Sequence, residues 1–120
     1  MPSIVLFSQQ TTAPEHDHPR EARRVSGNPQ RTTWNHYTNA SGEFYSGVWA
    51  SEAGSWRIEM GATEDEFFFV TEGHCRLVDE AGVAVEARAG DSLVIPAGFK
   101  GLFEVIEPMK KHYVIVERKA

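Results

Sequence analysis

The chain has 120 residues, of which 41% are hydrophobic, and this balance suits one globular domain with a single core. Seventeen acidic against twelve basic residues give a net charge of −5, so we do not expect a nucleic-acid partner. No apolar run reaches membrane-spanning length, the first residues lack a secretory signal, and the single cysteine suits a reducing compartment. We therefore expect a cytoplasmic protein without a membrane partner.

The N-terminal quarter of the chain differs from the rest. Ile4 to Phe7 is a short apolar run that could add a strand to a sheet edge, in this chain or in a second copy. Residues 11–31 are polar, carry three prolines and show no apolar period, which predicts an extended arm that wraps the domain. We therefore expect an N-terminal strand and arm over residues 1–30 and one domain over residues 31–120.

Short strand-like segments follow one another from Arg31 onward. They are rich in aromatic and β-branched residues, and glycine, asparagine or proline separates most of them. No window carries a convincing helical stripe. This spacing predicts an all-β sandwich or barrel. The expected strands cover residues 32–38, 44–50, 55–60, 66–72, 74–78, 83–87, 92–95, 101–106 and 112–118.

Two stretches, EFFFVTEG and GDSLVIPAGF, resemble the paired hairpin motifs of cupins. With further matching pieces, the likeness is to the small single-domain cupins related to the ureidoglycine aminohydrolase cupin domain, a family of unknown function. The resemblance implies an RmlC-like jelly-roll β-barrel over about residues 31–117, and it implies homodimers. The matching residues are Glu66 with Gly73, Gly90 with Pro96-Ala97-Gly98, GVW at 47–49 and KHY at 111–113.

The histidines that bind the metal ion in such cupins are missing here. The resemblance places a first pair a few positions before Glu66 and a third histidine after the second-motif glycine. A mononuclear site needs three or four converging donors, and only Glu66 remains, with Glu59 as a helper. We therefore expect a lost metal site and no metal cofactor. In this chain the first histidine pair falls on Glu59 and Gly61, or on Met60 and Ala62, and the third histidine falls on Gly101.

The five histidines of this chain do not replace the missing ligands. His16 and His18 have ligand-like spacing but lie in the arm, where we expect solvated loop residues. A structural role is the simpler interpretation of His36, although it could face the cavity. We expect His74 to be exposed at a turn. His112 and its neighbour Tyr113 face opposite sides of their strand, so at most one of them lines the interior.

The strand that begins at Glu66 is predicted to be covered on both faces. Glu66, Phe68 and Val70 share one face, and Phe67 and Phe69 share the other. The resemblance points Glu66 into the barrel, where burial would raise the pKa of its carboxyl unless a cation paired with it. The candidate cations are Arg57, Lys100 and Lys111. Two interpretations of Glu66 stay open, a general acid/base and a structural ion-pair partner.

Three hypotheses for function follow. The first is a cupin with a degenerate metal site that binds a small polar metabolite. The second is an enzyme related to ureidoglycine aminohydrolase that acts on a small nitrogenous metabolite through metal-free proton transfer. The third is a structural or interaction protein with a filled barrel. The catalytic candidates are Glu66, Lys111 and Tyr113, and the candidate ligand-binding residues are Trp49, Trp56, Phe68, Phe103 and Glu59.

Two further expectations concern Cys75 and the assembly. Cys75 lies on a predicted strand on the same side as Leu77, so we interpret it as a small buried apolar residue rather than a nucleophile. Aromatic residues on both faces of one strand leave apolar surface outside the core, which a second copy can cover. We therefore expect a homodimer.

Overall fold

The computed structural model describes residues 2–119, and almost all of its regular structure is β. Met1, the first residue of the expected arm, and Ala120, the last residue of the expected domain, lie outside this range. No helix among the described residues has the length and apolarity needed to cross a membrane. The elements are η1 (Phe7–Gln9), β1 (Glu15–Asp17), η2 (Glu21–Arg23), β2 (Arg24–Ser26), β3 (Arg31–Thr38), β4 (Phe44–Ser51), β5 (Gly54–Glu59), β6 (Glu64–Asp79), β7 (Ala84–Arg88), β8 (Ser92–Ile95) and β9 (Lys100–Glu117).

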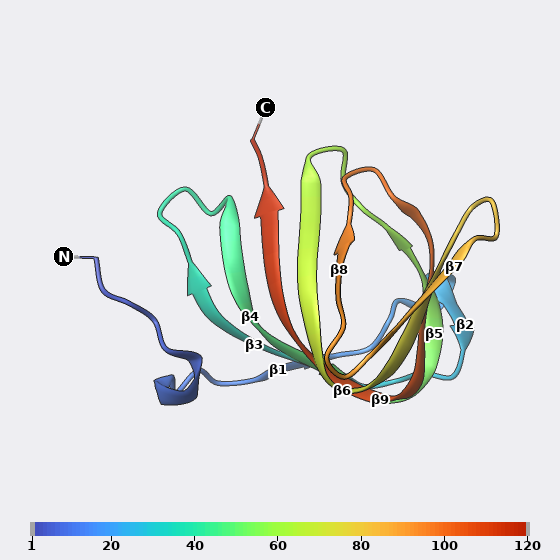
Figure 1. The fold of residues 1–120 in the computed structure, drawn as a ribbon, viewed down its shortest axis with the longest axis horizontal. Helices are drawn as coiled ribbons and strands as arrows, with labels where there is room; N and C mark the ends of the chain where they lie inside the picture. Colours follow the sequence, from blue (N-terminus) through green and yellow to red (C-terminus); the bar gives the residue numbers. More distant parts are fainter. Residues whose placement is uncertain (1, 120) are drawn as a thin grey trace.

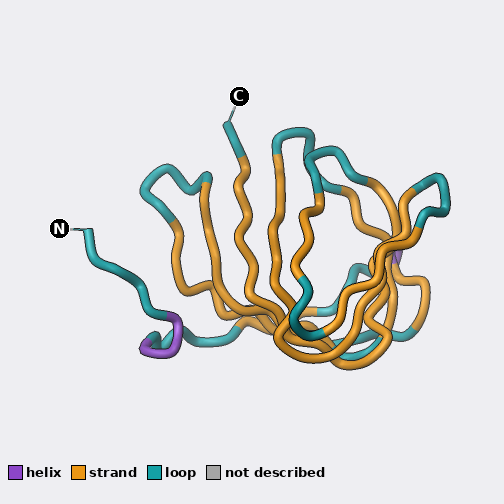
Figure 2. The backbone as a smooth tube through the Cα atoms, in the orientation of Figure 1, coloured by secondary structure: helices purple, strands orange, loops and turns teal. Residues whose placement is uncertain are grey.

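The expected all-β barrel is confirmed, and it is one curled sheet. Strand order runs β1-β3-β4-β9-β5-β2, with β6 pairing to β7, β8 and β9. Figure 1 shows β3, β4, β9, β6 and β8 side by side on one side of the curl and β5, β2 and β7 on the other. Figure 2 shows the same curl as a backbone tube, in which strands make up most of the chain.

Two long strands, β6 and β9, produce the curl. They pair along nearly their whole length, but the register shifts between Val70 and Cys75. Gly73 has φ +86°, and a Cβ there would lie 2.2 Å from the carbonyl oxygen of Pro108. Proline and positive-φ glycine fit such bulges, which bend a strand without ending it. The first half of β9 therefore pairs with β5 and its second half with β4.

The expected strand breaks at these two positions are wrong. Gly73 was predicted to separate two strands, and so was Pro108, but β6 and β9 continue through both. The physical reason is that the register shifts three times between Val70 and Cys75, through extra residues on both strands, and the ladder then resumes. The turn signals mark the bend of the barrel rather than the ends of its strands.

The arm is more ordered than its composition indicates. β1 pairs with β3, and β2 pairs with β5, so residues 18–23 bridge two edges of the sheet. These edge strands were not predicted, because three paired residues leave no detectable period. The apolar run Ile4 to Phe7 forms no strand within this chain, and Ile4 is exposed while Phe7 begins η1.

The core lies on the inner face of the curl. Phe68 and Val70 are completely buried, as the alternation predicts. Phe67 and Phe69 point outward and remain 43% and 38% exposed. The expectation that this strand is covered on both sides is therefore wrong for the single chain, because β8 and β9 flank β6 without covering its outer face.

Candidate functional site

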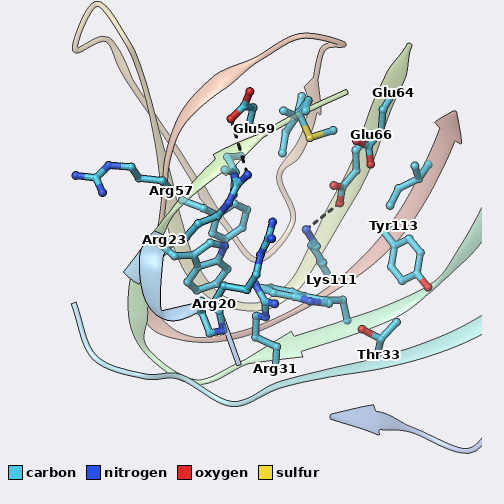
Figure 3. A pocket seen from close by; sticks show the side chains of 18 of the residues that line it. Arg20, Arg23, Arg31, Thr33, Arg57, Glu59, Glu64, Glu66, Lys111 and Tyr113 are labelled. Atoms are coloured by element: carbon cyan, nitrogen blue, oxygen red, sulfur yellow. Dashed lines mark hydrogen bonds and ion pairs between the residues drawn. The ribbon is translucent and has the colours of Figure 1, made fainter. Parts of the chain in front are cut away.

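A cavity of about 440 Å³ opens inside the curl, between the arm and the ends of β4, β5, β6 and β9. This volume falls within the ordinary range of small-molecule sites. Figure 3 shows the side chains around it, with Lys111 and Glu66 joined near its centre. It is lined by Pro19, Arg20, Arg23, Arg31, Thr33, Tyr45, Trp49, Trp56, Arg57, Ile58, Glu59, Met60, Glu64, Glu66, Ile95, Phe103, Lys111, Tyr113 and Ile115.

A nearly buried ion pair forms the polar centre of this cavity. Nζ of Lys111 donates to Oε2 of Glu66 at 2.9 Å, and the two side chains are 6% and 12% exposed. Of the three cations considered from the sequence, Lys111 makes this pair. Lys100 instead pairs with Glu59 at 3.6 Å, and Arg57 points away from the cavity (Figure 3).

The register of β9 explains where Lys111 lies. It pairs with Val70 of β6 on one side and with Trp49 of β4 on the other, so its side chain enters the interior. The ammonium lies 4.0 Å from the centre of the Phe68 ring and 4.5 Å from that of Trp49. Aromatic faces attract a cation, so the rings and Glu66 together compensate the charge.

Aromatic rings form the floor beside this pair. Trp56 and Phe103 stack with centroids 5.2 Å apart and an interplanar angle of 14°. Trp49 meets Phe103 edge-on at 5.8 Å. Trp49, Trp56 and Phe103 reach the cavity, whereas Phe68 lies behind them in the core and contacts Lys111. The floor is therefore rigid and apolar, apart from one fixed cation.

Tyr113 lies in the same wall with its hydroxyl engaged. Oη donates to Oδ1 of Asn35 at 2.7 Å. Burial, reinforced by the charge of Glu66, raises the pKa of Tyr113 to about 12. Burial also raises the pKa of its neighbour Tyr45, which lines the cavity too. Both phenols are neutral near pH 7, so neither acts as a base there, and the proton of Tyr113 is already donated to Asn35.

The sequence-predicted residue Glu59 lies apart from the central pair. Its side chain is 54% exposed at the rim, where it pairs with Arg23 at 3.8 Å and with Lys100 at 3.6 Å. Glu59 lines the cavity mouth but does not converge with Glu66. Its carboxylate is therefore not available as a second inner donor.

The donor set in the barrel does not fit a metal ion. Among residues 2–119, no group of three histidine, cysteine, aspartate or glutamate side chains is close enough to hold one. The one inner carboxylate, Glu66, already accepts from the ammonium of Lys111. A divalent ion there would meet a fixed positive charge instead of further ligands.

His74 and His36 make structural contacts outside the cavity. His74, expected at an exposed turn, is 7% exposed because β6 continues through this position. Its Nε2 lies 2.7 Å from Glu86, so the expectation of exposure is wrong. His36 contacts Thr12 at 2.8 Å and the ring of Phe7, outside the cavity.

The sequence reasoning missed the basic residues that the arm and β3 contribute. Arg20 and Arg23 come from the arm, and Arg31 begins β3. Glu64 was missed as well, on the opposite side of the cavity (Figure 3). The run PREARR carried a signal, since three arginines in five positions are unusual in a chain with an acidic excess. Only the pairing of β1 and β2 shows that this run crosses the cavity mouth.

Comparison with known proteins identifies the fold. A protein of unknown function of the DUF861 family from Pseudomonas syringae pv. tomato superposes with a TM-score of 0.77 at 20% identity, over 90% of this chain and 45% of that one. The EutQ protein of Clostridium difficile gives 0.66 at 22% identity, over 81% and 78% of the two chains. A DUF861 family protein from Thermotoga maritima gives 0.51 at 26% identity, over 55% and 73%.

These likenesses show a cupin jelly roll, and this chain spans less than half of the Pseudomonas protein. A search of curated proteins gave no match. The family model for the EutQ-like cupin domain matches residues 38–113, which is more than half of the chain. The match covers the strands that supply Trp49, Glu66 and Lys111. The chain therefore belongs to the family of EutQ-like cupin domains.

Proposed function

We propose that this cupin has a degenerate metal site and binds a small polar metabolite in its barrel. One observation carries the proposal: a cavity of about 440 Å³ has the nearly buried Lys111–Glu66 pair at its centre and an aromatic floor. A fixed cation and anion provide hydrogen-bonding groups of both kinds, and the rings supply apolar contact area. An open cavity of this size speaks against a barrel filled by its own side chains.

Native mass spectrometry of the full chain, purified without a histidine tag, tests this proposal. We expect a retained small molecule, or binding of one from a panel of amino acids, organic acids and sugars. Quenching of tryptophan fluorescence by a bound compound should weaken in Trp49→Phe, since Trp49 lines the cavity. It should persist in Trp34→Phe, because Trp34 lies outside the cavity beside Lys110. A protein that retains nothing and binds nothing contradicts the proposal.

The second candidate is an enzyme related to ureidoglycine aminohydrolase that acts on a small nitrogenous metabolite. The contact between Lys111 and Glu66 favours it, because a paired ammonium and carboxylate can exchange a proton with a substrate. Glu66 and Lys111 would then be the catalytic pair, and Tyr113, whose proton is donated to Asn35, would accept a hydrogen bond from the substrate. Ammonia release from ureido and amino acids, abolished by Glu66→Gln in a protein that stays folded, would establish this activity.

We also propose that the protein is a cytoplasmic homodimer. The outer patch of Phe67, Phe69 and Val94 supports association, because these apolar side chains are 43%, 38% and 60% exposed. Phe67 and Val94 are partners in the β6–β8 ladder, so the patch is continuous. A second copy can bury the same patch symmetrically. The buried reduced thiol of Cys75 agrees with a cytoplasmic location.

A further inference from the structure

The cavity lining is mainly basic, although the chain as a whole is acidic. The net charge of the protein is −5, yet five basic and three acidic side chains line the cavity and its rim. Lys111 is balanced by Glu66, and Glu59 is shared between Arg23 and Lys100. Arg31 is balanced by Asp17 and Arg57 points outward, so the positive charge left over is that of Arg20 and part of Arg23, with Glu64 on the opposite side. The basic residues are Arg20, Arg23, Arg31, Arg57 and Lys111, and the acidic ones are Glu59, Glu64 and Glu66.

The arginines of the cavity differ in how far they are already paired. Arg31 is fully engaged, since Nε and one terminal nitrogen donate to the two carboxylate oxygens of Asp17 at 2.9 and 2.7 Å. Arg23 makes only a 3.8 Å contact with Glu59. The side chain of Arg20 has no ion-pair partner among residues 2–119. Arg20 and the loosely held Arg23 are therefore free to receive an anion.

The backbone that carries Arg20 and Arg23 is held in place. Pro19 is completely buried, and its carbonyl accepts from Nε of Arg24 at 2.9 Å. The backbone N–H of Arg23 donates to the carbonyl of Arg20 at 2.8 Å, which closes the short turn of η2. With β1 and β2 paired at either end, little backbone freedom is left to lose on binding.

The two sides of the cavity carry opposite charges. Figure 3 shows Arg20, Arg23 and Arg31 on the side away from Glu64 and Glu66, while Arg57 points outward. A guanidinium binds a carboxylate through two parallel hydrogen bonds. Only Arg20 and part of Arg23 are left to balance the charge of a ligand, which matches a monoanion better than a dianion. This balance favours a carboxylate over a phosphate.

We propose that the N-terminal arm supplies an anion subsite, in which Arg20 and Arg23 hold the carboxylate of a small organic acid. The body of the acid lies against the ring of Trp49, because Phe103 and the guanidinium of Arg31 already cover that of Trp56. This inference rests on the proposed function and adds two points to it, the class of ligand and the contribution of the arm. Arg20 is the anchor, and Arg31 positions the arm through Asp17.

The test uses the full chain with benzoate as probe and benzamide as its neutral isostere, measured by calorimetry. We expect benzoate to bind at least tenfold more tightly than benzamide, because the charge-assisted pair is lost with the amide. Arg20→Gln should weaken benzoate binding by about tenfold and leave benzamide unchanged. Arg88→Gln, which removes the same charge from a 66% exposed side chain of β7 outside the cavity, should change neither. Circular dichroism checks that both variants fold.

Each contrary result has a distinct meaning. Equal binding of benzoate and benzamide, or equal effects of Arg20→Gln and Arg88→Gln, would overturn the anion subsite. Inorganic phosphate competing with benzoate at equal concentration would overturn the assignment to a carboxylate. A neutral compound retained in native mass spectra, with no binding of benzoate, would overturn this inference and leave the proposed function standing. A barrel that holds neither a retained compound nor any probe would overturn both.

Discussion

The ammonium of Lys111 lies 2.9 Å from the carboxylate of Glu66 in the interior of the barrel. The resemblance to metal-binding cupins assigns Glu66 to the motif that forms their metal site. Here a side-chain cation contributed by the last strand is its partner. The cavity therefore contains a permanent ion pair whose positive member cannot be removed by chelation.

Breaking this pair should destabilise the protein more than removing it whole. Lys111→Met leaves a nearly buried carboxylate without its partner, and we expect the free energy of unfolding to fall by about 3 kcal/mol. The double variant Glu66→Gln with Lys111→Met should recover most of that loss, because neither charge remains buried. Urea unfolding of wild type, both single variants and the double variant measures the coupling. Losses that simply add would contradict this account of the pair.

Alkaline pH should weaken the fold through Tyr113. Burial raises the pKa of its phenol to about 12 in the folded protein, whereas a tyrosine in the unfolded chain ionises near pH 10. Between these values the unfolded chain holds fewer protons, so the free energy of unfolding falls as the pH rises from about 10 to about 12.

The matching variant is Tyr113→Phe. It loses the hydrogen bond to Asn35, worth on the order of 1 kcal/mol, and it should show a shallower decline of stability above pH 10. Tyr45, whose pKa is also raised by burial, still contributes to the decline in both proteins. Urea unfolding at intervals from pH 8 to pH 11 compares the two. Parallel curves would show that Tyr113 does not carry the dependence.

The thiol of Cys75 should be unreactive in the folded protein. It is completely buried, and burial raises the pKa of its thiol to about 11, so very little thiolate exists at neutral pH. We expect a disulfide reagent such as dithionitrobenzoate to react slowly at pH 8 and at once in denaturing urea. Rapid reaction of the native protein would mean that the strand around Cys75 opens readily.

The sequence predicted the strands well and their continuity poorly. Alternation identified Phe68 and Val70 as inward-facing because burial on one face imposes a period of two. Local composition predicts strand ends at Gly73 and Pro108, because it cannot distinguish a turn from a bulge that a distant partner completes. His74 was misjudged for the same reason.

Only some residues of the candidate site could be predicted from the sequence. Glu66, Lys111 and the aromatic floor were accessible from the sequence because motif resemblance and strand alternation both indicate the interior. Arg20 and Arg23 were not, because nothing local shows that a polar arm returns across the mouth of the barrel. Their role depends on the pairing of β1 and β2 with edges far away in the sequence.

Self-association should depend on the outer patch of Phe67, Phe69 and Val94. Phe67→Glu places a charge at the centre of this patch, where a symmetric contact would bring two such charges together. We expect the wild type to sediment as a dimer and the variant as a monomer at micromolar concentration. Val83→Glu is the matched control, because Val83 is 61% exposed just beyond the turn of the β6–β7 hairpin, outside the patch. A wild type that is monomeric at every concentration tested, or a control that dissociates as readily as Phe67→Glu, would refute this assignment of the interface.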